Sequence, residues 1–334
     1  MINTLKSLKH QLFLLKINHD KKREAIARRD SAEFKERYAS LDKTFTRTVL
    51  PSGPFIWGIT MVKNEADIVE QTIRHLFNQG VDHILAADNG SSDGTYEILL
   101  ELSKILPVHV IQDRELAYYQ SEKMTWLTDR VMEAGAEWII PFDADEFWYG
   151  VSAPLSEVLR SQKGHTIELT KLYNVFPSVE GPTLGIDPTP HWDLKVCFSR
   201  WENAVIKMGN HEVIAPGKQK LNEVAIIHYP WRSKEQFTRK LRQGAKALEA
   251  TNLPEDMGYH WRRNGDITVE SATPLWEALL HGEVDNETIT WHPTRPLTPI
   301  GSLPQEFKEI VHLLKEQDEY RYLTQIFPDG KNTI

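Results

Sequence analysis

Two aspartates separated by one residue, Asp143 and Asp145, directly follow an apolar segment at residues 138–142. Carboxylate oxygens are the ligands that Mg²⁺ and Mn²⁺ prefer in proteins. Two aspartates at the end of a strand can reach one such ion and, through it, a diphosphate whose negative charge the ion neutralises. Charged side chains beside an apolar strand also need a partner. The pair therefore predicts a site for a divalent metal, Mn²⁺ or Mg²⁺, although a solvated turn is an alternative.

Three strand-then-helix units precede the two aspartates. Strands are expected at 55–62, 83–87, 108–111 and 138–142, and helices at 65–78, 93–105 and 121–134. This alternation predicts an α/β fold, Rossmann-like, with a mostly parallel sheet and helices on both faces. Ligands of such sheets bind beyond the carboxyl ends of the strands. Asn64 and Glu65 follow the first strand and Asp88 follows the second, so we expect them to share one site with Asp143 and Asp145.

The remaining chain suggests three domains. Residues 1–50 form a basic amphipathic helical arm, residues 51–250 the α/β domain, and residues 251–334 a helical and loop extension that packs on it. Further strands are expected at 166–172, 194–199, 212–215 and 224–228, and further helices at 233–250, 273–280 and 304–317.

Charge is distributed unevenly along the chain. The net charge is −8, which argues against a nucleic-acid partner. Residues 1–29 carry eight Lys and Arg against Asp20 and Glu24, with leucines at helical spacing. This arm is either an interfacial helix on anionic lipid or a packing helix with a solvated basic face.

Location follows from features that the sequence lacks. No signal peptide or membrane-spanning stretch is apparent, and a single cysteine, Cys197, suits a reducing compartment. We therefore expect a cytoplasmic protein, with peripheral membrane contact through residues 1–29.

Three segments, in this order and spacing, resemble the family 2-type glycosyltransferases of GT-A fold. They are Ile-Thr-Met-Val-Lys-Asn-Glu at 59–65, Ala-Asp-Asn-Gly-Ser-Ser-Asp-Gly-Thr at 87–95, and Phe-Asp-Ala-Asp-Glu-Phe at 142–147. The likeness is greatest to the branch with Asn-Glu after the first strand and Asp-Ala-Asp-Glu-Phe after the fourth. A downstream segment, Ile-His-Tyr-Pro-Trp-Arg-Ser at 227–233, also resembles that branch, and the resemblance covers about residues 54–246.

The resemblance implies roles for matching residues. Asn64 and Glu65 would lie in the loop that cradles the nucleoside, and Asp88 would bind the base or ribose. Asp143 and Asp145 would hold the metal and the diphosphate. The family more often has two acidic residues where this chain has Asp88-Asn89, which leaves the identity of the base open.

Three residues further along the chain are candidates for the same site. The resemblance implies that His228, although far along the chain, binds the metal or the diphosphate. The alternative is a histidine that is buried in the core. Arg232 and Lys240 have the chemistry to bind phosphate oxygens, and a solvated helix face is the alternative for both.

Two carboxylates are candidates for the catalytic base. An inverting transfer needs a group that takes the proton from the acceptor hydroxyl. Asp193 lies beside Trp192, whose ring could stack on an acceptor sugar, and Glu212 is the second candidate.

These observations predict a metal-dependent, inverting glycosyltransferase that acts in cell-surface polysaccharide synthesis. Its donor would be a UDP- or GDP-sugar and its acceptor a saccharide or glycolipid. The alternatives are a nucleotidyltransferase and a catalytically inactive carbohydrate-binding or scaffold module. The Gly-rich phosphate loop of a nucleotidyltransferase is missing, because residues 62–66 read Val-Lys-Asn-Glu-Ala. No Gly-x-Gly-x-x-Gly follows the first strand, which disfavours a Rossmann dehydrogenase or methyltransferase.

Overall fold

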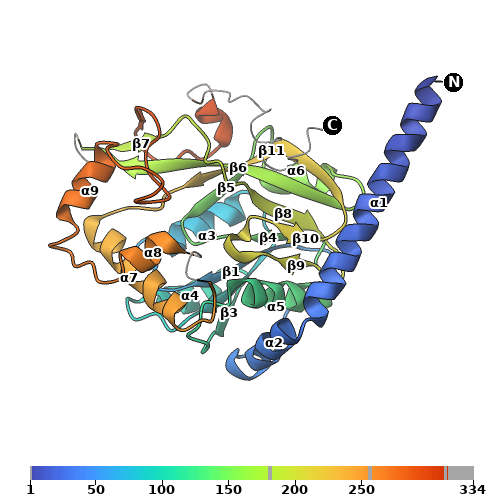
Figure 1. Cartoon of the computed structure of the whole chain (residues 1–334), viewed down its shortest axis with the longest axis horizontal. Coiled ribbons are helices and arrows are strands. Elements are labelled where there is room, and N and C mark those ends of the chain that lie inside the picture. Colours follow the sequence, from blue (N-terminus) through green and yellow to red (C-terminus); the bar gives the residue numbers. More distant parts are fainter. Residues whose placement is uncertain (1, 180–182, 255–257, 312–313, 315–334) are drawn as a thin grey trace. The chain divides into compact units, whose positions relative to one another are not determined.

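A computed structural model describes residues 2–179, 183–254, 258–311 and 314 of the chain (Figure 1). It contains two compact units. Unit 1 comprises residues 1–170 and 195–224, and unit 2 comprises residues 171–194 and 225–334. These units do not follow the expected domain boundaries, and the division into three domains stays a prediction.

The centre of unit 1 is a parallel sheet with the strand order β3-β2-β1-β4. Its strands are β1 (Ile56–Val62), β2 (His83–Asp88), β3 (Val108–Gln112) and β4 (Trp138–Pro141). The two strands at the middle of this order, β2 and β1, are almost entirely buried, as parallel strands covered on both faces must be. The α/β class predicted from the sequence is therefore confirmed.

The register of the parallel strands brings their carboxyl ends to one edge. Val62 pairs with Asp88, Asp88 pairs with Gln112, and Ile59 pairs with Pro141. The residues that follow β1, β2 and β4 consequently leave the sheet on the same side. This edge carries the motifs that the sequence analysis singles out.

Helices surround this sheet. They are α3 (Val69–Asn78), α4 (Thr95–Ser103), α5 (Gln120–Glu133) and α6 (Leu155–Ser161). Helix α5 contacts β1, and α4 contacts β2 and β3. At the amino terminus lie α1 (Ile2–Asp30) and α2 (Ala32–Thr44), and α2 packs against α5. No helix in the described ranges is both long and apolar enough to cross a bilayer.

Antiparallel strands extend unit 1 beyond β4. Strand β8 (Lys195–Ser199) pairs with β4, and the first part of β6 (Thr166–Pro177) pairs with β8. Strand β5 is Glu146–Gly150, and β11 (Lys218–His228) begins in unit 1 and ends in unit 2. Strand β9 (Val205–Ile206) forms a small antiparallel hairpin with β10 (Val213–Ile214). A 3₁₀ turn, η1 (Met208–Asn210), lies between β9 and β10.

Unit 2 combines a short antiparallel sheet with helices. Strand β7 (Leu184–Ile186) pairs with β12 (Thr298–Ile300) and with the last residues of β6. The helices are α7 (Lys234–Glu249), α8 (Tyr259–Arg263) and α9 (Thr273–Leu280), with a 3₁₀ turn, η2 (Phe307–Glu309). The core of this unit includes Phe176, Trp231 and Phe237.

Two expected helices differ from the structure. The helix expected at 65–78 begins only at Val69, because Asn64 has a φ of +57° and residues 64–68 form a hydrogen-bonded loop. Only η2 lies in the described part of the helix expected at 304–317, so that prediction is wrong there, and the rest lies outside the described residues.

Glu168 is an unusual residue of the antiparallel part of the sheet. It lies on β6 opposite Cys197 of β8 and is fully buried. Neither of its carboxyl oxygens has a hydrogen-bond partner among the described residues. Burial raises the pKa of Glu168 to about 7, although Lys220 lowers it. Burial thus disfavours the ionised form of this carboxyl.

We expect Glu168 to make the protein less stable as the pH rises from 5 to 8. An acid whose pKa is higher in the folded than in the unfolded state stabilises the fold fully below its ordinary pKa of 4.5. That contribution is lost as the pH rises through about 7. Melting temperatures of Glu168→Gln should therefore vary less with pH than those of the native protein. The exposed Glu97→Gln is the control, and equal pH profiles for all three proteins would contradict this assignment.

Candidate functional site

Two loops at the carboxyl edge are joined by hydrogen bonds. The loop after β1 uses Asn64, whose amide donates to the Ser91 hydroxyl and whose side-chain oxygen accepts from the Ser92 amide at 2.7 Å. The Glu65 amide donates to the Thr95 hydroxyl at 2.8 Å. The structure thus brings Asn64 and Glu65 together with the loop that follows Asp88. A conformation that needs φ near +57° favours asparagine at position 64.

Asp88 ends β2 with one carboxylate oxygen engaged and one available. Oδ2 accepts from the amides of Gly90 and Ser91, both at 3.1 Å. Oδ1 is buried and has no hydrogen-bond partner in the part of the chain that the structure describes. A buried carboxylate oxygen without a partner is costly unless a ligand supplies a donor. Asp88 therefore has the chemistry to accept a hydrogen bond from a bound hydroxyl or amide.

Asn89, the next residue, is fixed by a buried ion pair that the sequence analysis does not identify. Its side-chain amide donates to Asp113 Oδ2 at 2.8 Å and to the Glu115 carbonyl at 2.7 Å. Asp113 in turn pairs with Lys123 of α5 at 2.6 Å, and both side chains are buried. The loop after β2 is thereby connected to β3 and to α5.

The two-aspartate motif forms a tight turn between β4 and β5. The Asp143 amide donates to Glu146 Oε2 at 3.1 Å, and the Glu146 amide donates to the Asp143 carbonyl at 3.0 Å. Trp148 Nε1 also donates to Glu146 Oε2, at 3.2 Å. The Thr72 hydroxyl of α3 donates to the Ala144 carbonyl. These contacts fix the backbone, so that Asp143 is 34% exposed while Asp145 is buried.

A buried lysine on β8 holds the motif in place. Lys195 Nζ lies 2.7 Å from Asp143 Oδ2, 2.8 Å from Glu146 Oε1 and 2.7 Å from the Gly209 carbonyl. The side-chain amide of Asn210 donates to Asp143 Oδ1 at 3.2 Å. Both oxygens of Asp143 thus accept hydrogen bonds from protein groups.

The charges at this turn explain the pKa shifts there. Burial alone would lower the pKa of Lys195, but Asp143 and Glu146 outweigh it and raise that pKa. Burial raises the pKa of Glu146 to about 7, against the lowering effect of Lys195. Burial also raises the pKa of Tyr118, and the charge of Asp143 adds to the rise. The Lys195 ammonium group therefore forms ion pairs with both Asp143 and Glu146, and Asp143 is the more exposed of these two carboxylates.

The carboxylates fit an open metal site better than a closed one. Over residues 2–179, 183–254 and 258–311, no group of three or more His, Cys, Asp and Glu has a metal-binding arrangement. Hard divalent ions often bind one or two carboxylates and complete their shell with substrate phosphates and water. Asp143 and Asp145 match that donor set, in which a diphosphate would supply the remaining oxygens.

Glu212 lies on the β9–β10 hairpin and contacts two lysines. Its carboxylate is 3.0 Å from Lys21 Nζ and 2.6 Å from Lys207 Nζ. Burial would raise the pKa of Glu212, but the hydrogen bonds from Lys207 and Lys21 lower it. A carboxylate with a lowered pKa is a weak proton acceptor. These contacts favour a structural role for Glu212, and its role as the base stays a prediction.

Asp193, His228, Arg232 and Lys240 belong to unit 2. The Asp193 amide donates to His191 Nδ1 at 3.2 Å, and the neighbouring Trp192 is 51% exposed. The ring of Trp192 is thus accessible for stacking. Whether this group lies near Asp143 stays a prediction.

His228 is buried and oriented by two contacts. Its Nδ1 is 2.8 Å from Asn174 Oδ1, and its ring packs edge-on against Trp291 at 5.1 Å between centroids. Because Asn174 Oδ1 can only accept, Nδ1 carries the proton, which leaves Nε2 as the acceptor nitrogen. A second hydrogen bond of this kind typically orients histidine metal ligands. The role of His228 as a ligand stays a prediction.

Arg232 and Lys240 both contact other groups of unit 2. Arg232 donates to the Tyr229 carbonyl at 3.1 Å. Lys240 Nζ lies 5.7 Å and 5.6 Å from the ring centroids of Trp231 and Trp291, a cation–π arrangement. Neither side chain is fully exposed, which speaks against a simple solvated helix face.

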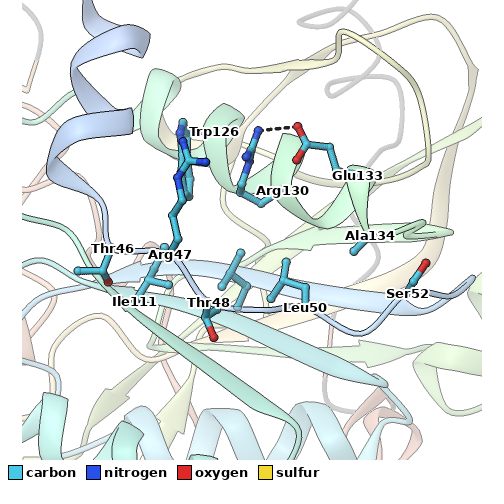
Figure 2. A pocket seen from close by; sticks show the side chains of 11 residues that line it. Thr46, Arg47, Thr48, Leu50, Ser52, Ile111, Trp126, Arg130, Glu133 and Ala134 are labelled. Carbon is cyan, nitrogen blue, oxygen red and sulfur yellow. Dashed lines mark hydrogen bonds and ion pairs between the residues drawn. The ribbon is translucent and has the colours of Figure 1, made fainter.

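Unit 1 also contains a cavity. Figure 2 shows this cavity of about 370 Å³, which is lined by the segment 46–52, by α5 and by residues of β2 and β3. Arg47, Arg130 and Trp126 line it, and Arg130 forms an ion pair with Glu133. None of the predicted site residues is among its lining residues.

Lys195, Gly209 and Asn210 are the site residues that the sequence analysis misses. One signal is present, because Lys195 begins an apolar strand in which a charge needs a buried partner. No sequence signal identifies that partner, since Asp143 lies 52 residues earlier.

Comparison with known proteins identifies the central segment. Residues 59–150 match the family described as Glycosyl transferase family 2. This segment includes the loops after β1 and β2 and the two-aspartate motif. The match confirms the resemblance and the enzyme class that the motifs predict, a glycosyltransferase. No curated protein matches the chain.

Solved structures show only a weak likeness. A TarS fragment from S. aureus in complex with UDP has a TM-score of 0.36 and 13% identity, and covers 70% of this chain and 82% of its own. The mannosyltransferase PcManGT from Pyrobaculum calidifontis, with GDP-Man and Mn²⁺, has a TM-score of 0.36 and 14% identity, with coverage of 81% and 88%. GalNAc-T7 with UDP, GalNAc and Mn²⁺ has a TM-score of 0.35 and 13% identity, with coverage of 75% and 66%. Similarity this low carries no inference about this chain.

Replacing Lys195 with methionine should lower the free energy of unfolding by about 3–5 kcal/mol, because it leaves buried carboxylates without their cation. Urea denaturation measures this change. The exposed Lys104→Met, which breaks only a surface pair with Glu101, should change stability by less than about 1 kcal/mol. Adding Glu146→Gln to Lys195→Met should restore part of the loss. Equal effects of the two lysine substitutions would contradict this account.

Proposed function

We propose that this chain transfers a sugar from a nucleotide-sugar donor, a UDP- or GDP-sugar, to a saccharide or glycolipid acceptor. The observation that carries the proposal is the position of Asp143. It is partly exposed at the carboxyl edge of a parallel sheet, and Lys195 and Asn210 hold both of its carboxylate oxygens. The family match over residues 59–150 supports the donor class.

The residues at the sheet edge suit the nucleoside and the diphosphate of a sugar nucleotide. Asp88, with its available Oδ1, would accept from the ribose or base. Asp143 and Asp145 would hold Mn²⁺ or Mg²⁺, which when bound neutralises the charge that develops on the leaving diphosphate. Asn64 and Glu65 would keep the nucleoside loop closed through their hydrogen bonds to Ser91, Ser92 and Thr95.

We propose Asp193 as the base that takes the proton from the acceptor hydroxyl in an inverting transfer. Trp192 beside it offers an exposed ring for stacking on a sugar. Glu212 is the less favourable candidate, because Lys21 and Lys207 lower its pKa. His228, Arg232 and Lys240 remain proposed contacts to the metal or diphosphate. We also propose action at the cytoplasmic side of a membrane, in cell-surface polysaccharide synthesis.

Calorimetry with UDP, GDP and CDP, each with and without Mn²⁺, tests whether the protein binds the nucleotide of the proposed donor. We expect one nucleotide to bind more tightly with Mn²⁺, and Asp143→Asn and Asp145→Asn to weaken that binding by about ten- to a hundredfold, the value of one or two charge-assisted contacts. The exposed Asp20→Asn is the matched control and should bind as the native protein does.

Two outcomes separate the alternatives. If no nucleotide binds with or without metal, the proposed function is wrong. If nucleotide binds but a panel of sugar nucleotides is neither hydrolysed nor used for transfer, the chain is an inactive binding module. Hydrolysis of one sugar nucleotide in the panel would identify the donor.

A further inference from the structure

The β9–β10 hairpin presents two residues to the Asp143 turn. Within this hairpin, residues 203–217, the Gly209 carbonyl accepts from Lys195 and the Asn210 side chain donates to Asp143. Gly209 has a φ of +81°, and a Cβ there would lie 2.2 Å from the His211 ring. Asn210 also has a positive φ and is fully buried. The Asp143 side chain therefore depends on how this hairpin is held.

Helix α5 holds one side of the hairpin. Gln120 Oε1 accepts from the Gly209 amide at 2.6 Å. The Ser121 hydroxyl donates to the Ile206 carbonyl at 2.6 Å, and the Ile206 amide donates to the Thr125 hydroxyl at 3.0 Å. These bonds satisfy the backbone groups of β9 and η1 that face α5.

The amino-terminal helix α1 holds the other side through apolar contact. Ala25 is 1% exposed and clusters with Phe34, Val205 and Ile214. Because Val205 and Ile214 belong to β9 and β10, the hairpin buries these apolar side chains against α1. Figure 1 shows α1 running beside β9 and β10.

Polar contacts from α1 bind the hairpin along its length. The Gly217 amide donates to Asn18 Oδ1 at 3.1 Å, and Lys21 pairs with Glu212 at 3.0 Å. Arg29 donates to the Ala204 carbonyl at 2.6 Å and makes a bidentate pair with Asp129 of α5 at 2.9 Å. The start, middle and end of the hairpin are each fixed to one helix.

Several basic side chains of the arm form ion pairs within unit 1. Lys21, Arg28 and Arg29 all pair with acidic residues of unit 1. Lys16, Lys22 and Arg23 are exposed. Half of the Lys and Arg side chains at residues 15–30 thus pair within unit 1, which supports a packing role for this stretch of α1.

We propose that α1 supports the donor site by keeping the β9–β10 hairpin in place. The hairpin then positions Gly209 and Asn210, which hold Lys195 and Asp143. This inference rests on the proposed function, since it assigns the arm a role in binding the nucleotide diphosphate. Asn210 is a positioning residue that acts through Asp143. Loosening α1 from the hairpin should weaken nucleotide binding although no residue of α1 touches the nucleotide.

Ala25→Asp tests this proposal, with Ala27→Asp as its matched control. Both substitutions introduce the same side chain into the same helix, but Ala25 faces the hairpin whereas Ala27 is exposed. A carboxylate at position 25 would lie against Val205 and Ile214 and force α1 away from them. By calorimetry with Mn²⁺ and the nucleotide that the native protein binds, we expect Ala25→Asp to raise Kd by about tenfold, the effect of one lost charge-assisted bond. Ala27→Asp should bind as the native protein does.

A double-mutant cycle distinguishes positioning from general destabilisation. Asn210→Ala should raise Kd by a similar factor, and combining it with Ala25→Asp should add little, because both act on the same contact to Asp143. Additive effects, or an unchanged Kd in Ala25→Asp, would overturn the proposal. If Ala25→Asp does not fold, Asn18→Ala removes one hydrogen bond to the hairpin without adding charge and replaces it in the cycle.

Hydrogen exchange separates failure of this inference from failure of the proposed function. Exchange at the Gly209 and Asn210 amides should be faster in Ala25→Asp than in Ala27→Asp, whether or not nucleotide binds. If the native protein binds no nucleotide, the proposed function and the arm's part in it are both wrong, even if exchange shows that α1 holds the hairpin. If the native protein binds nucleotide and exchange is unchanged, only the inference about the arm is wrong.

Discussion

A buried ammonium group is stable in a protein only when nearby groups replace the water that it has lost, and Lys195 meets that condition with three oxygens. Two belong to Asp143 and Glu146 in the turn between β4 and β5, and one to Gly209 in the β9–β10 hairpin. The two ion pairs and this hydrogen bond connect a strand, a turn and a hairpin that are distant in the sequence. The position of the Asp143 side chain at the candidate donor site depends on this connection.

Around Lys195 the loops of the sheet edge are held by hydrogen bonds rather than by apolar packing. Asn64 joins the loop after β1 to the loop after β2, and Asn89 joins the latter to β3. Such groups are already oriented before a ligand binds, which lowers the cost of ordering them. Asp88, whose Oδ1 has no hydrogen-bond partner among the described residues, and the partly exposed Asp143 come from strands on either side of β1. In the function that we propose, Asp88 would accept a hydrogen bond from the nucleoside, and Asp143 would hold the divalent ion that binds the diphosphate.

Much of this fold can be predicted from the sequence, because each parallel strand is a short apolar run that is followed by polar residues. Asp88 and Asp143 could be assigned to one edge for that reason. The antiparallel strands were harder to locate, since β5 is continuous with the acidic motif and β9 has only two residues. Lys195 and Asn210 could not be assigned, because their partner is distant in the sequence and a lone lysine or asparagine carries no spacing signal. The basic arm illustrates the same limit: its charge indicates an anionic partner, and part of that partner is Glu122, Asp129 and Glu212 of the same chain.

A crystal structure of the protein with a nucleoside diphosphate and Mn²⁺ would show whether Asp143 and Lys195 form the donor site. We expect the diphosphate to lie at Asp143, with Lys195 still within hydrogen-bond distance of Asp143, Glu146 and the Gly209 carbonyl. A nucleotide bound in the cavity lined by Arg47 and Arg130, or a Lys195 released from its carboxylates, would contradict it.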